Sequence, residues 1–257
     1  MKDFVKEYWD KNAQKFGGSH WASWGDNFMI ELEIDIIAKY LKDGDYVLDV
    51  GCGNGYSTFE QVKRHSLSIE GIDYSLFMIK EAIKKRNEIK KERTILFFEG
   101  DVRKLDYKDE LFDKTYVTRV LINLQTWEEQ IQGIKECLRV TKPGGTIILL
   151  EAFWEPLQKL NAIRLICGLQ PLVEHDFNRY LKESKLIEFL EREGIKYKKE
   201  EFSSVYYFGS RVLRELVTDF KSFEGYDNPI NEEFCKLAKK YNGGGVGIQI
   251  AYILYKL

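Results

Sequence analysis

Three closely spaced glycines follow an apolar segment near residue 50, and this pattern is typical of a ligand-binding loop. The segment 46–50 reads Tyr-Val-Leu-Asp-Val, which predicts a buried strand, and Gly51, Gly53 and Gly55 follow it directly. A dinucleotide-binding loop needs a further glycine at position 56, where it allows close packing of helix on strand, but this chain has Tyr56. The loop therefore favours a ligand that it does not bind through a pyrophosphate group.

A carboxylate ends the next predicted strand. The segment 67–73 is partly alternating and ends in Asp73, 22 residues after Gly51. In a strand–helix–strand unit this spacing brings a carboxylate to the ribose hydroxyls of a bound nucleoside. The alternative is that Asp73 caps its own neighbour, where the next helix begins after Ser75. Its place at a strand end favours the nucleoside site.

The elements that must position these residues alternate along the first 150 residues. Helices are predicted after the glycine loop, after Ser75 and from Thr126, between strands at 46–50, 67–73, 94–98, 112–118 and 146–152. The last of these strands is apolar throughout, as expected for a strand covered on both faces. The chain therefore predicts an α/β fold with a doubly wound, mostly parallel sheet whose ligand site lies at the carboxyl ends of the strands.

Segments on both sides of this core are expected to cover the site. Residues 1–42 predict two helices, at 4–16 and 26–41, joined by an aromatic loop that contains Trp21. Beyond residue 153 the sequence predicts an irregular stretch at 154–180, helices at 184–193, 211–221 and 232–241, a charged strand at 195–202, and a last, antiparallel strand at 246–255. We expect one domain over 1–257, with a core at 45–152 and helical cap insertions at 153–182 and 203–245.

The order of these motifs resembles the class I S-adenosylmethionine-dependent methyltransferases. The resemblance covers residues 45–152 and the C-terminal strand, and it is carried by the glycine loop, Asp73, Asp101-Val102 and Lys142-Pro-Gly-Gly145. It implies a Rossmann-like, seven-stranded fold with S-adenosylmethionine as cofactor, the acid Asp101 on the adenine amino group and the backbone N–H of Val102 on the ring. The cofactor-binding residues predicted in this way are Asp49, Gly51, Cys52, Gly53, Gly55, Asp73, Tyr74, Asp101, Val102, Arg119, Tyr8 and Trp21.

Three further segments resemble a bacterial subgroup associated with surface-polysaccharide and small-metabolite biosynthesis. They are residues 118–124, 127–130 and 203–208. This resemblance implies O-methylation of a sugar, nucleotide-linked or phosphorylated intermediate. The subgroup has a histidine directly before an asparagine in its cap, whereas here Phe177 precedes Asn178 and the nearby histidine is His175. N-methylation of a small amine, or a regulatory domain that binds the cofactor or a nucleotide without catalysis, are the alternatives.

The chemistry of methyl transfer decides which further residues are needed. Alignment of acceptor, methyl carbon and sulfur supplies most of the rate acceleration, and a general base is required only when the acceptor is an alcohol. His175 is the predicted base, with a surface loop residue as the alternative. Acceptor contacts are expected from Glu151, Trp154, Asn178, Tyr206, Tyr207 and Arg211. An anionic acceptor held by Arg119, Arg164 or Arg211 would need no base.

Composition narrows the partners that we expect. The net charge is −2, and the chain lacks the Asn/Asp-Pro-Pro-aromatic motif with which adenine-amino methyltransferases grip a base, so no nucleic-acid partner is expected. The four cysteines match neither a zinc site nor a disulfide framework, and no apolar run reaches about 18 residues. The sequence therefore predicts a cytoplasmic enzyme with a small-molecule substrate, without metal or membrane partner, and it leaves the oligomeric state open.

Overall fold

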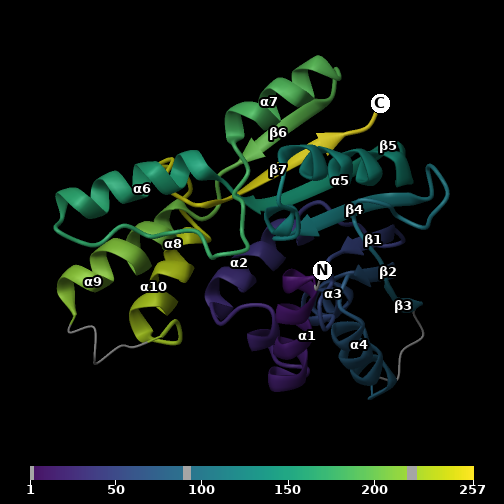
Figure 1. Cartoon of the computed structure of the whole chain (residues 1–257), viewed down its shortest axis with the longest axis horizontal. Helices are drawn as coiled ribbons and strands as arrows, with labels where there is room; N and C mark the ends of the chain where they lie inside the picture. Colours follow the sequence, from purple (N-terminus) through teal and green to yellow (C-terminus); the bar gives the residue numbers. More distant parts are fainter. Residues whose placement is uncertain (1–2, 89–93, 219–224) are drawn as a thin grey trace.

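A single seven-stranded sheet forms the centre of the computed structural model, which describes residues 3–88, 94–218 and 225–257 (Figure 1). The strand order is β3-β2-β1-β4-β5-β7-β6. The first five strands pair in parallel, and β7 runs antiparallel to both β5 and β6. The strands are β1 (Tyr46–Val50), β2 (Ser68–Asp73), β3 (Ile95–Glu99), β4 (Phe112–Thr118), β5 (Thr141–Ala152), β6 (Lys196–Glu200) and β7 (Gln249–Tyr255). This arrangement confirms the predicted fold class.

The strand order reverses at β1, and this reversal determines where a ligand can bind. β1 pairs with β2 on one side and with β4 on the other, so Val50 lies beside both Ile72 and Val117. The helices that follow β1 and β4 leave toward opposite faces of the sheet, which opens a crevice outside the carboxyl ends of these two strands. The glycine loop lies at that point, because it directly follows β1.

Helices cover both faces of the sheet. Figure 1 shows α2 (Asn27–Ala38), α3 (Tyr56–Arg64) and α4 (Leu76–Glu88) on one face, and α5 (Trp127–Val140) and α7 (Glu183–Arg192) on the other. The hydroxyl of Thr126 caps α5 by accepting a hydrogen bond from the Glu129 N–H, as the sequence predicts. The first helix, α1 (Phe4–Phe16), packs against α4 beside the carboxyl ends of β2 and β3. None of the helices in the described ranges combines the length and apolar character needed to cross a bilayer.

The first cap insertion is more regular than expected. Residues 154–180 were predicted as irregular, but Trp154–Ile166 form the helix α6. Its buried face includes Asn161 and Arg164, whose side chains bind the backbone of the following loop and Glu215. Because polar residues occupy positions on the inner face, the helix has no apolar stripe for sequence analysis to detect.

The first helix of the second cap insertion begins earlier than predicted. A continuous helix runs through α8 (Ser204–Phe208), a π-helical turn (Gly209–Leu213) and α9 (Arg214–Val217), while the end of the predicted helix at 211–221 lies outside the described residues. It packs on α10 (Pro229–Ala238). A Cβ added at Gly209 would lie 2.0 Å from Cγ of Phe234, so glycine is required inside this helix for the two helices to meet. In Figure 1, α6 and α8 to α10 lie together beyond one side of the sheet.

Candidate cofactor and acceptor site

A cavity of about 330 Å³ opens at the carboxyl ends of β1, β2, β3 and β4. This volume lies within the range of small-molecule sites. Its lining includes most of the residues predicted to bind the cofactor: Asp49, Gly51, Cys52, Gly53, Asp73, Tyr74, Asp101, Val102 and Arg119. Gly55, Tyr8 and Trp21 do not line it. Gly55 instead allows close packing, because an added Cβ would meet the rings of Phe59 and Phe97.

The glycine loop has a backbone that only glycine adopts readily. Gly51 and Gly53 have φ values of 75° and 54°. A Cβ added at Gly51 would lie 2.0 Å from a methyl carbon of Val120, whereas one added at Gly53 would meet no atom within 4 Å. The loop is tied to the segment after α1, because the buried Asn54 side chain donates to the carbonyls of Gly17 and Ser19. The loop therefore presents open backbone at Gly53 and is held rigidly at Gly51.

Asp49 of β1 and Asp73 of β2 make different contacts around this loop. Asp49 accepts hydrogen bonds from the hydroxyls of Thr58 and Tyr116, so it anchors the loop from beneath. Asp73 accepts from the N–H of Gly53 at 2.9 Å and from the N–H of Ser75 at 2.8 Å. The carboxylate thus caps its neighbour and also lines the cavity, and its contact with a ribose stays a prediction. Burial raises the pKa of Asp49 to about 7 and that of Asp73 to about 6.

These raised pKa values predict how stability depends on pH. Burial also raises the pKa of Glu33 to about 7 and that of Glu151 to about 8. Because all four acids bind protons more tightly folded than unfolded, their contribution to stability is lost as pH rises through the folded values. We expect the melting temperature of the ligand-free protein to fall between pH 5 and pH 8, measured by calorimetry. A melting temperature that rises across this interval would contradict the assignment.

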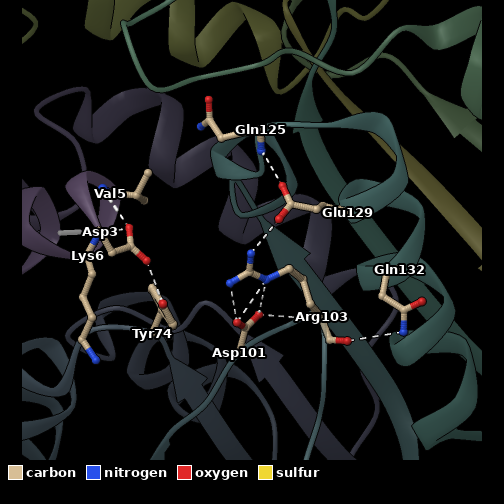
Figure 2. Close-up of polar contacts among 9 residues, drawn as sticks. All are labelled: Asp3, Val5, Lys6, Tyr74, Asp101, Arg103, Gln125, Glu129 and Gln132. Atoms are coloured by element: carbon tan, nitrogen blue, oxygen red, sulfur yellow. Dashed lines mark hydrogen bonds and ion pairs between the residues drawn. The ribbon is translucent and has the colours of Figure 1, made fainter. Parts of the chain in front are cut away.

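A network around Arg103 lies at the adenine end of the cavity (Figure 2). The Arg103 guanidinium donates to both carboxylate oxygens of Asp101 and, at 2.7 Å, to Glu129 of α5. Although partial burial acts against it, hydrogen bonding by Arg103 holds the pKa of Asp101 below its usual value. The sequence identified Glu129 only as a capping partner and gave no signal for Arg103. The network fixes the orientation of Asp101 in the lining.

The N-terminal helix covers part of the cavity. Asp3, Val5 and Trp9 line it, and the Tyr74 hydroxyl donates to Asp3 at 2.7 Å (Figure 2). The ammonium group of Lys6 is 2.5 Å from a carboxylate oxygen of Glu99 at the end of β3. The sequence predicts this cover, but two of the aromatic residues predicted for it, Tyr8 and Trp21, do not line the cavity. Tyr8 points instead to Phe177, with ring centroids 4.6 Å apart, and Trp21 is 44% exposed and covers Gly25.

The predicted acceptor-binding residues do not line the cavity, because other parts of the fold bind their polar groups. Glu151 accepts hydrogen bonds from three successive backbone N–H groups, beginning with Val120. Tyr206 and Arg211 both bind Asp26, and the hydroxyl of Tyr207 binds Gln249. These four predictions are therefore corrected to structural roles. The sequence could not show which groups these side chains bind, because their partners come close only in the folded structure.

His175 and the remaining cap residues also lie outside the lining. The His175 ring packs against Phe177 and Tyr8, with centroid distances of 4.4 and 5.6 Å. Trp154 is 41% exposed, and the backbone N–H of Asn178 donates to the carbonyl of His175. The structure therefore does not bring the predicted base to the cavity.

A group of polar atoms without hydrogen bonds lies beside the carboxyl end of β4. Thr118 Oγ1, Arg119 Nε and Asn123 Oδ1 are buried and unpaired by hydrogen bonds, and all three residues line the cavity. Behind Arg119 lies Glu33 of α2, which is 1% exposed and whose two carboxylate oxygens also lack a hydrogen bond. Sequence analysis missed Glu33, because the apolar stripe of α2 gave no reason to place an acid on its inner face. Unpaired buried groups of this kind indicate a ligand site.

The residues of the cavity fit S-adenosylmethionine. The loop at Gly51 and Gly53 can hold the methionine portion, Asp73 the ribose, and Asp101 with the Val102 N–H the adenine. The bound cofactor supplies an electrophilic methyl group on a sulfonium. Within the described residues there is no group of three or more side chains suited to a metal ion.

This fold and site are similar to those of the class I S-adenosylmethionine-dependent methyltransferases. Residues 47–145 match a family model described as a methyltransferase domain.

Two curated relatives and a solved structure are similar to this chain. An uncharacterised methyltransferase of Schizosaccharomyces pombe is 35% identical over 120 residues, which is 44% of this chain and 42% of that protein. An uncharacterised protein of Methanocaldococcus jannaschii is 29% identical over 234 residues, 85% of each chain. The structure of a geranyl diphosphate methyltransferase in complex with its substrate and sinefungin superposes over 98% of both chains, with a TM-score of 0.63 and 12% identity, and so shows the shared fold.

Proposed function

We propose that the protein transfers the methyl group of S-adenosylmethionine to a hydroxyl oxygen or an amine nitrogen of a small molecule. The observation that carries this proposal is a group of buried polar atoms without hydrogen bonds on Glu33, Thr118, Arg119 and Asn123, beside the loop predicted to hold the methionine portion. Most of these atoms accept hydrogen bonds, so they suit an acceptor whose reacting atom carries hydrogen. The cover formed by α1 also favours a small acceptor over a nucleic acid, a protein or a membrane.

The finer identity of the acceptor stays a prediction. The sequence favours a sugar, nucleotide-linked or phosphorylated intermediate of polysaccharide biosynthesis and leaves a small amine as the alternative. Both classes carry the required N–H or O–H group. His175, the base predicted for an alcohol acceptor, does not line the cavity, and neither a free amine nor an anionic acceptor needs such a base.

A transfer assay with a panel of acceptors tests the proposal. Protein is incubated with methyl-labelled S-adenosylmethionine and with sugars, sugar nucleotides, phosphorylated metabolites or small amines, and S-adenosylhomocysteine and labelled products are measured by mass spectrometry. We expect one of these classes to raise product formation at least about tenfold above the acceptor-free rate. Methylation confined to nucleic acid or protein would overturn the proposal.

A further inference from the structure

Glu33 differs from the other deeply buried acids in having unused hydrogen-bond capacity. Asp26, Asp49 and Glu151 each accept at least two hydrogen bonds from the protein. Among the described residues, Glu33 is the only buried acid with both carboxylate oxygens unbonded. Such a group is unfavourable for folding unless it is compensated, so its presence calls for a functional explanation.

The neighbour of Glu33 is a cation that also lies on an aromatic ring. Arg119 Nε is 3.1 Å from Oε1 of Glu33 but makes no hydrogen bond, and the guanidinium carbon is 4.9 Å from the centre of the Trp24 ring. A carboxylate combined with an indole face is the arrangement with which proteins bind ammonium groups. Arg119 itself has a φ of 56°, which is unusual for a residue with a side chain.

The alternative explanation for the contact of Arg119 with Glu33 is a structural ion pair. The same protein contains two such pairs for comparison. Arg164 donates two parallel hydrogen bonds of 3.0 Å to the two oxygens of Glu215, and Arg211 donates to Asp26. Paired in this way, buried charges satisfy each other. The contact of Arg119 with Glu33 is instead a single ion pair of 3.1 Å between Nε and Oε1, and Oε2 of Glu33 accepts no hydrogen bond.

The pair of Arg119 and Glu33 lies next to the cofactor cavity. Ile30, which precedes Glu33 by three residues on α2, lines the cavity, as do Thr118, Arg119 and Asn123. The sequence also predicts that Arg119 binds the cofactor. If Arg119 turned to that task, it would leave its place beside Glu33 and Trp24, at the part of the cavity that Thr118 and Asn123 line.

We propose that Glu33, Trp24, Thr118 and Asn123 form a binding site for a small amine, whose nitrogen takes the place that the Arg119 guanidinium now occupies. This inference rests on the proposed function and selects the amine among its acceptors. Burial raises the pKa of Glu33 to about 7, although Arg119 opposes the rise and Asp26 adds to it. Glu33 is therefore suited to take a proton from an ammonium group near neutral pH.

The reaction balances with the cofactor as the only co-reactant. The bound ammonium gives one proton to a carboxylate oxygen of Glu33, which leaves a neutral amine with a lone pair. The nitrogen uses this lone pair to form a bond with the methyl carbon, while the electrons of the carbon–sulfur bond stay on sulfur. The products are a methylated ammonium, a neutral thioether and protonated Glu33, which returns its proton to solvent.

Binding of a probe cation tests the site without knowledge of the natural acceptor. Trimethylammonium chloride and its neutral counterpart tert-butanol are titrated into protein saturated with S-adenosylhomocysteine, and binding is followed by ligand-observed NMR. For ligands this small we expect millimolar affinity at best. Trimethylammonium should bind at least about tenfold more tightly than tert-butanol, and Glu33→Gln should remove that preference.

Two further variants make the test specific. Glu215→Gln alters a buried acid that pairs with an arginine away from the cavity, and it should leave the cation preference unchanged. Trp24→Leu removes the ring and should weaken trimethylammonium binding by about 2–30-fold, which keeps the proposal testable if Glu33→Gln fails to fold. Binding of S-adenosylhomocysteine serves as the control for folding.

The outcomes separate this inference from the proposed function. Protein that binds S-adenosylhomocysteine but shows no preference for the cation, or an equal preference in Glu33→Gln, overturns the amine site and leaves methyl transfer to another small acceptor standing. An intact cation preference together with methylation of nucleic acid or protein alone would instead overturn the proposed function.

Discussion

Replacing Asp73 by alanine is expected to lower the affinity for S-adenosylhomocysteine by at least about 100-fold while the protein stays folded. A hydrogen bond to a charged group contributes about 1.5–3 kcal/mol, and a ribose offers two hydroxyls to this carboxylate. The side chain lies in the cavity lining at the carboxyl end of β2, where its position is fixed by the N–H groups of Gly53 and Ser75. Isothermal titration calorimetry measures the change directly.

Two controls separate ligand binding from support of the loop. Asp73→Asn keeps one oxygen for these backbone N–H groups but removes the charge, so it should lose less affinity than alanine. Asp43 accepts a hydrogen bond from the Ser66 N–H and does not line the cavity, so Asp43→Ala should leave the affinity within about threefold. A change of less than threefold for Asp73→Ala would remove Asp73 from the site.

The fold could be predicted where local pattern decides structure. The apolar run at 46–50, the glycines after it and the alternation of strand and helix required only the periodicity and turn chemistry of neighbouring residues. The α6 helix escaped prediction because Asn161 and Arg164 occupy its inner face and are satisfied by partners distant in the sequence. Periodicity cannot show a buried face that is polar.

The cofactor-binding half and the acceptor-binding half of the site also differ in how far the sequence predicts them. Cofactor residues such as Gly51 and Asp73 follow from backbone conformation and strand ends, which the sequence reveals. The acceptor half depends on which polar groups already have partners. Glu151 and Arg211 are polar residues near strand ends or in the cap, but the fold uses their hydrogen bonds, whereas Glu33 accepts no hydrogen bond on the otherwise apolar buried face of α2.

The cavity should discriminate strongly between S-adenosylhomocysteine and NAD. Five carboxylates line it, at Asp3, Asp49, Asp73, Asp101 and Glu129, while Arg103 is paired with two of them and Arg119 with Glu33. A pyrophosphate would meet this negative charge, and both arginines of the lining are already engaged in ion pairs. The third glycine of the dinucleotide pattern is also replaced by Tyr56, which lines the cavity.

Ligand-dependent thermal stability therefore tests the central claim, that this cavity binds the methyl-donor cofactor. A ligand at 100 times its Kd stabilises the folded state by about 2.7 kcal/mol, which corresponds to several degrees in melting temperature for a chain of this length. We expect S-adenosylmethionine and S-adenosylhomocysteine to raise the melting temperature by this amount and NAD at the same concentration to leave it unchanged. An equal rise with NAD, or no rise with S-adenosylhomocysteine, would contradict the account.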